Sequence, residues 1–252
     1  MKRHYPRVLS IAGSDSGGCA GIQADLKTIA ALGGFDMTAI TAVTVQNTMG
    51  VKAVHAVPPD IIRGQIAAVA EDIGLDAVKS GMLADTDTVC LVAECLRKYH
   101  PPFYVLDPVM VATSGDALVR EETAAALKRE LMPLATVVTP NLKEAELLSG
   151  RRIETIEDMQ AAASELLACG CKAVLVKGGH LDGGDMTDVL CIAGEDRPHY
   201  LSTPRIPTGN LHGTGCTLSS AIAVCLALGH RWPKPSDGPR TTSRRPLRPV
   251  RT

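Results

Sequence analysis

Residues 212–229 read HGTGCTLSSAIAVCLALG, a turn with two glycines followed by an apolar helix whose first turn contains Cys216. Gly213 and Gly215 allow the turn to approach a ligand closely, because glycine has no Cβ and tolerates unusual backbone angles. The helix start adds unpaired N–H groups and the positive end of the helix dipole. These features predict an anion site at Gly213–Gly215, where the same N–H groups would lower the pKa of the Cys216 thiol.

A second candidate is the stretch TPNLKEAE, which places Asn141 and Glu144 three residues apart where a strand changes to a helix. An amide oxygen and a carboxylate at this spacing suit a Mg²⁺ ion that keeps most of its waters and contacts phosphate through them. By itself, the spacing favours a capping box, in which the Asn141 side chain caps the helix and the Glu144 side chain accepts from the Asn141 backbone N–H. Both interpretations stay open.

Other polar or adaptable side chains follow further predicted strands. Asp107, after FYVL, would add an anionic contact for the same ion, or it is an ordinary turn carboxylate. Lys177, after AVLV, would contact a polyphosphate as a point charge, or it is an ordinary lysine at a strand end. Gln46 has a donor and an acceptor that match the ring nitrogen and exocyclic amine of a pyrimidine. Met82 suits an apolar wall against a flat ring, although such a methionine is more often core.

The composition limits the class of protein. The chain has 252 residues, of which 45% are apolar and 3% aromatic, and this fits one large domain with an aliphatic core. A formal net charge of −1 gives no electrostatic reason to expect nucleic acid or an anionic membrane as a partner. The eight cysteines include no C-x-x-C pair, which favours reduced thiols without a structural zinc. No apolar run suits a membrane span or a secretion signal, so we expect a soluble, cytoplasmic protein.

Short apolar runs alternate with helical patterns along most of the chain. Continuous apolar strands between amphipathic helices indicate a mostly parallel sheet that is covered on both faces. From about Asp185, two runs predict an antiparallel pair before the final helix. We therefore expect an α/β fold, a three-layer α/β/α sandwich with an antiparallel edge. Because ligands bind beyond the carboxyl ends of the strands in such sheets, the polar side chains described above should meet there.

The stretch AGSDSGGCAGIQADLKT (12–28) is a glycine-rich turn between a predicted strand and a predicted helix. Its glycines do not fit G-x-G-x-x-G, and the chain has no G-x-x-x-x-G-K-[ST] motif. The sequence therefore disfavours a dinucleotide-dependent oxidoreductase. The glycines form either a tight turn or a floor beneath a small flat ligand.

Taken in order, these motifs are similar to those of a known family. The likeness extends in order over nearly all of residues 7–229, through the motifs RVLSIAGSDSGGCAGIQADLKT, TVQNT, KSGML, LDPVM, SGD, TPNLKEAELL, LVKGGH, STPRI and HGTGCTLSSAIA. The ordered set resembles the hydroxymethylpyrimidine and hydroxymethylpyrimidine-phosphate kinases of thiamine synthesis, which are members of the ribokinase-like superfamily. The resemblance implies a ribokinase-like fold, an ATP- and Mg²⁺-dependent phosphotransferase acting on a small pyrimidine, and a homodimer.

The resemblance also implies roles for individual residues. Cys216 would act as the base beside the acceptor hydroxyl, with the turn at Gly213 and Gly215 holding the transferring γ-phosphoryl group. The residues of the pyrimidine site would be Gly13, Asp25, Gln46, Met82 and Val109. The nucleotide and its phosphates would contact Lys177 and Asn141, and the metal would be near Asp107 and Glu144. The same site would perform two steps, first to the monophosphate and then to the pyrophosphate.

Two departures from the family's pattern lead to expectations of their own. Cys19 stands where the family usually has a further glycine, so a positive φ at this position would strain the turn. After residue 229 the chain becomes rich in proline and arginine. We therefore expect a kinase domain at 1–229 and a disordered tail at 230–252, whose abrupt change of composition favours an altered gene end over a nucleic-acid-binding segment.

Two other functions stay open at this point. A pyridoxal or pyridoxine kinase would use the same fold and a similar site for a pyridine that carries a hydroxymethyl group, although Gln46 and Met82 favour the pyrimidine. A non-catalytic protein that binds the pyrimidine or its phosphates is the alternative from a different class. The presence of Cys216, Asn141, Glu144 and Lys177 counts against it.

Overall fold

The computed structural model describes residues 5–47, 49–110, 121–178, 185–206 and 212–230. In these residues nine strands form one sheet in the order β3-β2-β1-β4-β5-β6-β7-β8-β9. The strands are β1 (Arg7–Asp15), β2 (Phe35–Asn47), β3 (Gly50–Ala56), β4 (Ala77–Ser80), β5 (Tyr104–Leu106), β6 (Val137–Val138), β7 (Ala173–Val176), β8 (Asp185–Ile192) and β9 (His199–Pro204). The central strands from β2 to β7 are all parallel to one another.

The helices connect and cover these strands. They are α1 (Gly21–Ala31), α2 (Pro59–Asp72), α3 (Thr86–Tyr99), α4 (Glu121–Ala126), α5 (Leu142–Ser149), α6 (Ile156–Leu167) and α7 (Thr214–Ala227). After α4 the chain continues through a wider π-type turn, η1 (Leu127–Leu131), and a 3-10 turn, η2 (Met132–Leu134). None of the helices in the described part of the chain has the length and apolar composition that crossing a membrane requires.

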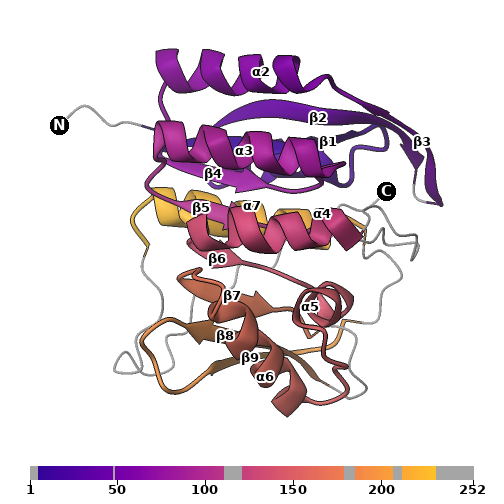
Figure 1. Cartoon of the computed structure of the whole chain (residues 1–252), viewed down its shortest axis with the longest axis vertical. Coiled ribbons are helices and arrows are strands. Elements are labelled where there is room, and N and C mark those ends of the chain that lie inside the picture. The colour runs from indigo at the N-terminus through magenta and orange to yellow at the C-terminus, as the bar shows by residue number, and fades with distance from the viewer. Residues whose placement is uncertain (1–4, 48, 111–120, 179–184, 207–211, 231–252) are drawn as a thin grey trace.

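The predicted three-layer α/β/α architecture is confirmed. In Figure 1, α2 to α6 lie on the near side of the sheet, and α7 lies on the far side. Two apolar clusters correspond to the two faces: a larger one beneath α2 to α6, and a smaller one that joins Ile29 of α1 and Val224 of α7 to the other face of the strands. The antiparallel pair β8–β9 is present as predicted.

The structure adds a second antiparallel edge that we did not predict. Strand β3 pairs antiparallel with β2, so both ends of the sheet depart from the parallel order. The short connection between β2 and β3 explains this pairing, because a parallel neighbour requires a crossover of a dozen or more residues. Only the central strands therefore have the parallel arrangement that directs their carboxyl ends to one edge.

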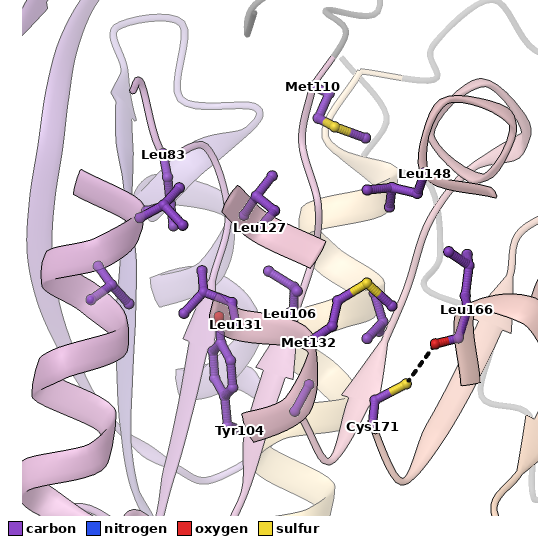
Figure 2. Packing of buried hydrophobic residues seen from close by; sticks show 14 of the residues in the cluster. Leu83, Tyr104, Leu106, Met110, Leu127, Leu131, Met132, Leu148, Leu166 and Cys171 are labelled. Carbon is purple, nitrogen blue, oxygen red and sulfur yellow. Dashed lines mark hydrogen bonds between the residues drawn. The ribbon is translucent and has the colours of Figure 1, made fainter. Parts of the chain in front are cut away.

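The larger cluster has the aliphatic composition that the sequence predicts. Figure 2 shows Leu106 of β5 facing Leu127, Leu131 and Met132 from the segment after α4. Tyr104 is the buried aromatic residue in this view, and its hydroxyl lies 2.6 Å from the Ser80 Oγ. Every buried side-chain polar atom in the described residues has a hydrogen-bond partner, so this packing leaves no desolvated group unpaired.

The order of the strands also shows where a ligand is expected. From β1 the chain moves outward to β2 and β3, and then returns to place β4 on the other side of β1. In open α/β sheets, ligands bind at the carboxyl ends of the strands where the order reverses in this way. Here those ends are Gly13–Asp15 of β1 and Ser80 of β4, and α7 packs against both strands.

Candidate active site at the start of α7

The glycine turn before α7 has the backbone conformation that an anion site needs. Gly213 is the N-cap of α7, with φ of 84°, and has no side chain with which to cap the N–H groups of the first turn. A Cβ built on Gly213 would lie 1.8 Å from the Cys19 carbonyl oxygen, so the turn fits closely against the loop after β1. Because the helix dipole adds positive potential at this point, the arrangement can bind an anion.

Several of the predicted phosphate-side residues meet at this turn. A Cβ built on Gly215 would lie 3.2 Å from Lys177 Nζ and 3.9 Å from Asp107 Oδ2. Lys177 Nζ donates to Asp107 Oδ1 at 3.1 Å, and Ser219 of α7 donates to Asp107 Oδ2 at 3.2 Å. Asp107 and Lys177 therefore lie together beside Gly215, and the roles that the resemblance implies for them stay predictions.

The charges of this group influence one another. Burial raises the pKa of Asp107, but Lys177 and Lys79 outweigh burial and hold it below the usual range. Burial disfavours the charge on Lys177, but Asp107 and Glu144 raise its pKa above the ordinary value. An ammonium that stays protonated beside an uncapped helix start increases the positive potential available to a phosphate.

Asn141 and Glu144 form the capping box, which is the alternative interpretation of their spacing. The Glu144 N–H donates to Asn141 Oδ1 at 2.9 Å, and the Asn141 N–H donates to Glu144 Oε2 at 2.8 Å. Asn141 also lies beside Lys177 through a parallel backbone bridge, which brings the start of α5 to the same edge. Burial raises the pKa of Glu144 to about 7, and the nearby Asp107 charge adds to this rise.

The raised pKa of Glu144 predicts a dependence of stability on pH. Between about pH 4.5 and 7 the folded chain holds a proton on Glu144 that the unfolded chain has lost, so the free energy of unfolding decreases as the pH rises through this window. Glu144→Gln keeps an acceptor for the Asn141 N–H. At pH 8 we expect its free energy of unfolding to exceed that of wild type by on the order of 1–3 kcal/mol, and at pH 5 we expect the two to be equal.

The matched control for this prediction is Glu157→Gln, because Glu157 is an exposed carboxylate in the first turn of α6. Urea unfolding at pH 5 and pH 8 makes the comparison. Parallel stability curves for wild type and Glu144→Gln would contradict the assignment.

The thiol of Cys216 does not have the lowered pKa that we predicted. Burial raises the pKa of this thiol to about 11, and Asp25 and Asp107 raise it further, whereas Lys79 and the Gly21 N–H lower it. The prediction is wrong because it considered only the helix start. Removing water from a thiolate and placing two carboxylates near it outweigh a few favourable N–H groups.

The residues predicted to contact the ring do not all lie together in the structure. Gly13 and Met82 lie together, since a Cβ built on Gly13 would lie 2.6 Å from Met82 Cε. Val109 is half-buried, and its N–H donates to the Asp107 carbonyl oxygen at 2.8 Å, which places it beside the phosphate-side residues. Asp25, in contrast, is fully buried and pairs with Lys79, so in this structure its carboxylate does not face the edge of the sheet.

Gln46 belongs to a polar network that includes a residue the sequence analysis did not assign. Its Nε2 lies 2.9 Å from His212 Nε2, and its Oε1 accepts from Thr44 Oγ1 at 3.2 Å. The same His212 nitrogen lies 3.3 Å from Asp15 Oδ2. An amide can donate two hydrogen bonds and accept two, so each end of Gln46 keeps one position for a ligand.

Other residues missed by the sequence analysis are Lys79, Ser219 and Ser220. The two serines stand three and four residues after Cys216, which is the spacing that places side chains on one face of a helix, so the sequence contained a signal for them. Cys19 causes none of the expected strain, because among the described non-glycine residues it is His100 that has a positive φ. The predicted tail, apart from His230, lies outside the described residues.

Comparison with known proteins agrees with this geometry. A family model described as phosphomethylpyrimidine kinase matches residues 15–236. A hydroxymethylpyrimidine/phosphomethylpyrimidine kinase of Rhizobium meliloti is 53% identical over 222 residues, which cover 88% of this chain and 82% of the relative. A thiamine biosynthesis bifunctional protein, ThiED, of Geobacter sulfurreducens is 48% identical, and this chain spans 46% of its length.

Two solved structures are similar over most of their length. Phosphomethylpyrimidine kinase of Clostridium difficile has a TM-score of 0.78 and 45% identity, with coverage of 90% of this chain and 92% of that one. An ADP complex of Bacillus subtilis pyridoxal kinase has a TM-score of 0.84 and 39% identity, with coverage of 90% and 86%.

Proposed function

The chain belongs to the phosphomethylpyrimidine kinase family and is a phosphotransferase of thiamine biosynthesis, and from this premise we propose how its residues divide the work. ATP donates its γ-phosphoryl group to the hydroxymethyl group of 4-amino-5-hydroxymethyl-2-methylpyrimidine. In a second step, the resulting monophosphate is the acceptor and the pyrophosphate is the product. Both steps occur at the start of α7.

The observation that carries this proposal is the meeting of Gly215, Lys177 and Cys216 at one helix start. The N–H groups of the turn and the Lys177 ammonium face the same point, where the charge on the transferring phosphoryl oxygens is stabilised. Phosphoryl transfer needs mainly alignment and charge neutralisation, so few groups are required to react covalently. In this arrangement the thiolate form of Cys216, next to the turn, accepts the proton of the substrate hydroxyl and becomes a thiol.

The ring is recognised on the side of β1 and β2. The remaining N–H of the Gln46 amide donates to the ring nitrogen of the pyrimidine, and the remaining lone pair of Gln46 Oε1 accepts from the exocyclic amine. Met82, against Gly13, provides an apolar contact for the flat ring. Val109, whose N–H donates to the Asp107 carbonyl oxygen, contacts the ring from the phosphate side. Asp25 acts indirectly in this proposal, because its carboxylate is buried against Lys79.

The metal of this reaction is the Mg²⁺ that accompanies ATP. The described residues contain no group of three or more His, Cys, Asp or Glu side chains that could hold a metal ion. The oxygens of Asp107 accept from Lys177 and Ser219, which suits contact through water and phosphate better than a protein-built cage. We therefore assign Asp107 and Glu144 to the waters and phosphates around Mg²⁺, and Asn141 and Lys177 to the nucleotide.

A second candidate activity is the phosphorylation of pyridoxal. It is favoured by the likeness to the Bacillus subtilis pyridoxal kinase structure. An ADP-release assay with Mg·ATP separates the two when hydroxymethylpyrimidine, its monophosphate and pyridoxal are offered one at a time. Turnover with both pyrimidines supports the proposal. Turnover with pyridoxal alone would show that the chain is a pyridoxal kinase instead. If the folded protein is inactive with all three substrates, the non-catalytic binding protein becomes the favoured alternative.

The role of Gln46 leads to a prediction about kcat/KM for the pyrimidine. We expect Gln46→Met, which keeps the size of the side chain and removes its donor and acceptor, to lower kcat/KM for hydroxymethylpyrimidine by about 10-fold to 200-fold. The KM for ATP should stay unchanged, because Gln46 lies on the ring side. Steady-state kinetics measure both, with Gln160→Met on α6 as the matched control. An equal loss of affinity for ATP would show that the substitution disturbs the whole site.

The homodimer implied by the resemblance and the cytoplasmic location expected from the apolar runs of the sequence stay predictions. Analytical ultracentrifugation of the full chain measures the first, and cell fractionation measures the second. The catalytic proposal depends on neither result, because each residue in it comes from one chain.

A further inference from the structure

A fully buried ion pair lies beneath the active-site turn. Lys79 Nζ of β4 is 3.0 Å and 2.9 Å from the two carboxylate oxygens of Asp25 on α1, and both side chains are 0% exposed. Lys79 is among the largest fully buried side chains of the described residues. A buried pair of this kind often stabilises a fold no better than apolar side chains of the same size, so its charges are explained better by what surrounds them.

Asp25 connects this pair to α7. Its Oδ1 accepts from Ser220 Oγ at 2.6 Å, and its Oδ2 accepts from Ser10 of β1. Ser220 stands four residues after Cys216 on the same helix, so the two side chains lie on one face. Ser219 makes the corresponding contact on the phosphate side by donating to Asp107. Two neighbouring serines thus attach the first two turns of α7 to two ion pairs: Ser219 bonds the Asp107–Lys177 pair, and Ser220 bonds the Asp25–Lys79 pair.

Four charged groups interact electrostatically with the Cys216 thiol. Lys79 comes from β4, Asp25 from α1, Asp107 from the end of β5, and Lys177 from the end of β7. Burial opposes the charge on Lys79, but Asp25, the Cys216 sulfur and Asp107 together raise its pKa above the ordinary value. An ammonium that stays protonated is a permanent positive charge beneath the thiol. A serine of α7 bonds the partner of each cation: Ser219 donates to Asp107, and Ser220 donates to Asp25. Lys177 lies beside Gly215 on the phosphate side, whereas Lys79 belongs to the fully buried pair.

We propose that Lys79 is a positioning residue for Cys216, held by Asp25 and Ser220 so that its ammonium faces the sulfur on which charge develops when the substrate proton is accepted. The proposal rests on the proposed function in one respect, namely the role of Cys216. It changes the role of Asp25, which fixes the Lys79 ammonium and the start of α7 instead of contacting the pyrimidine. No bond to substrate is required of either residue.

The test measures how fast iodoacetamide alkylates Cys216 at pH 8, without ATP, by mass spectrometry of the peptide that contains it. The thiolate is the reacting form, so the rate follows the thiolate fraction. Lys79→Met removes the positive charge and should slow alkylation at least tenfold. Asp25→Asn removes the negative charge and should accelerate it at least tenfold. A purely structural role would change both rates in the same direction, because either variant loosens the same buried pair.

Two controls belong to the same experiment. Cys225, at the far end of α7, is half-buried, and its alkylation reports any loosening of the helix. Arg63→Met removes a charge from an exposed ion pair on α2 and should leave the Cys216 rate unchanged. Changes of the same sign in Lys79→Met and Asp25→Asn, or no change in either, would overturn the proposal.

A milder variant keeps the proposal testable if either single substitution unfolds the chain. Ser220→Ala leaves both charges in place and removes one donor from Asp25, so the carboxylate is less neutralised and alkylation of Cys216 should slow by about threefold. Ser220→Thr, which retains the hydroxyl, should restore the rate. An unaltered rate in Ser220→Ala would contradict the proposal.

This test is separate from the test of kinase activity. If the predicted alkylation rates are found in a chain that does not phosphorylate the pyrimidine, the electrostatic role of Lys79 stands and the proposed function fails. If the chain is an active kinase and the rates do not respond, the role of Lys79 fails alone.

Discussion

We expect Cys216→Ala to lower turnover of hydroxymethylpyrimidine by about 10²-fold to 10⁴-fold, which is the usual contribution of a positioned base. The acceptor in this step is a neutral hydroxyl, whose proton must leave as the phosphoryl group arrives. In the second step the acceptor is a phosphate that is already ionised, since its second pKa is about 6. The same variant should therefore lose less than about tenfold in that step.

The pH dependence gives an independent check of this role. The pKa of Cys216 is raised to about 11, so the thiolate fraction increases as the pH rises from 7 to 9. For wild type, kcat/KM with hydroxymethylpyrimidine should increase across this range, and the increase should be absent in Cys216→Ala. ADP release measured from pH 6.5 to 9 with each pyrimidine provides the data. Equal losses in both steps, with an unchanged pH profile, would mean that Cys216 only positions the substrate.

The second large effect is expected for Gly213→Ala. The new Cβ would meet the Cys19 carbonyl oxygen at 1.8 Å, and a backbone atom cannot move aside as a flexible side chain can. The turn must therefore shift, and a displacement of about 1 Å at a reacting centre typically costs about 10²-fold in rate. We expect kcat to fall at least a hundredfold. The free energy of unfolding should fall by about 1–2 kcal/mol from the left-handed backbone alone.

Gly229→Ala is the matched control for this variant. Gly229 has φ of 82°, close to the 84° of Gly213, but a Cβ built there meets nothing within 4 Å. It should show a similar loss of stability from the backbone strain without the loss of turnover. Steady-state kinetics and urea unfolding of both variants make the comparison. Comparable turnover in the two variants would contradict the account of the turn.

The fold could be predicted because its central strands are buried on both faces. Strands β5 and β7 are continuous apolar runs for this reason, and the helices that precede them have one apolar side. Strand β4 is also fully buried, but it contains Lys79 and Ser80. Strand β3 has valines and alternating residues that suit a strand, but this composition does not predict its antiparallel pairing. Most of its residues are exposed, so its composition gives no indication of direction. The few residues that separate it from β2 would have indicated the pairing.

The site could be predicted only in part, for reasons that differ between residues. Asp107 and Lys177 come together because the carboxyl ends of parallel strands lie at one edge of the sheet, which the order of elements already implies. Gly215, at the start of α7, lies beside them. The pairing of Lys79 with Asp25 joins residues that are 54 positions apart. The pKa of Cys216 depends on charges from several elements at once, so it cannot be predicted from the local motif around this residue.

The most direct test of the central claim is to identify the product of the full chain by mass spectrometry after incubation with Mg·ATP and hydroxymethylpyrimidine. The account predicts that the pyrimidine gains one phosphoryl group and then a second, and that Cys216→Ala slows the first gain much more than the second. A wild-type chain that is folded and binds ATP, yet leaves the pyrimidine unmodified, would contradict the account.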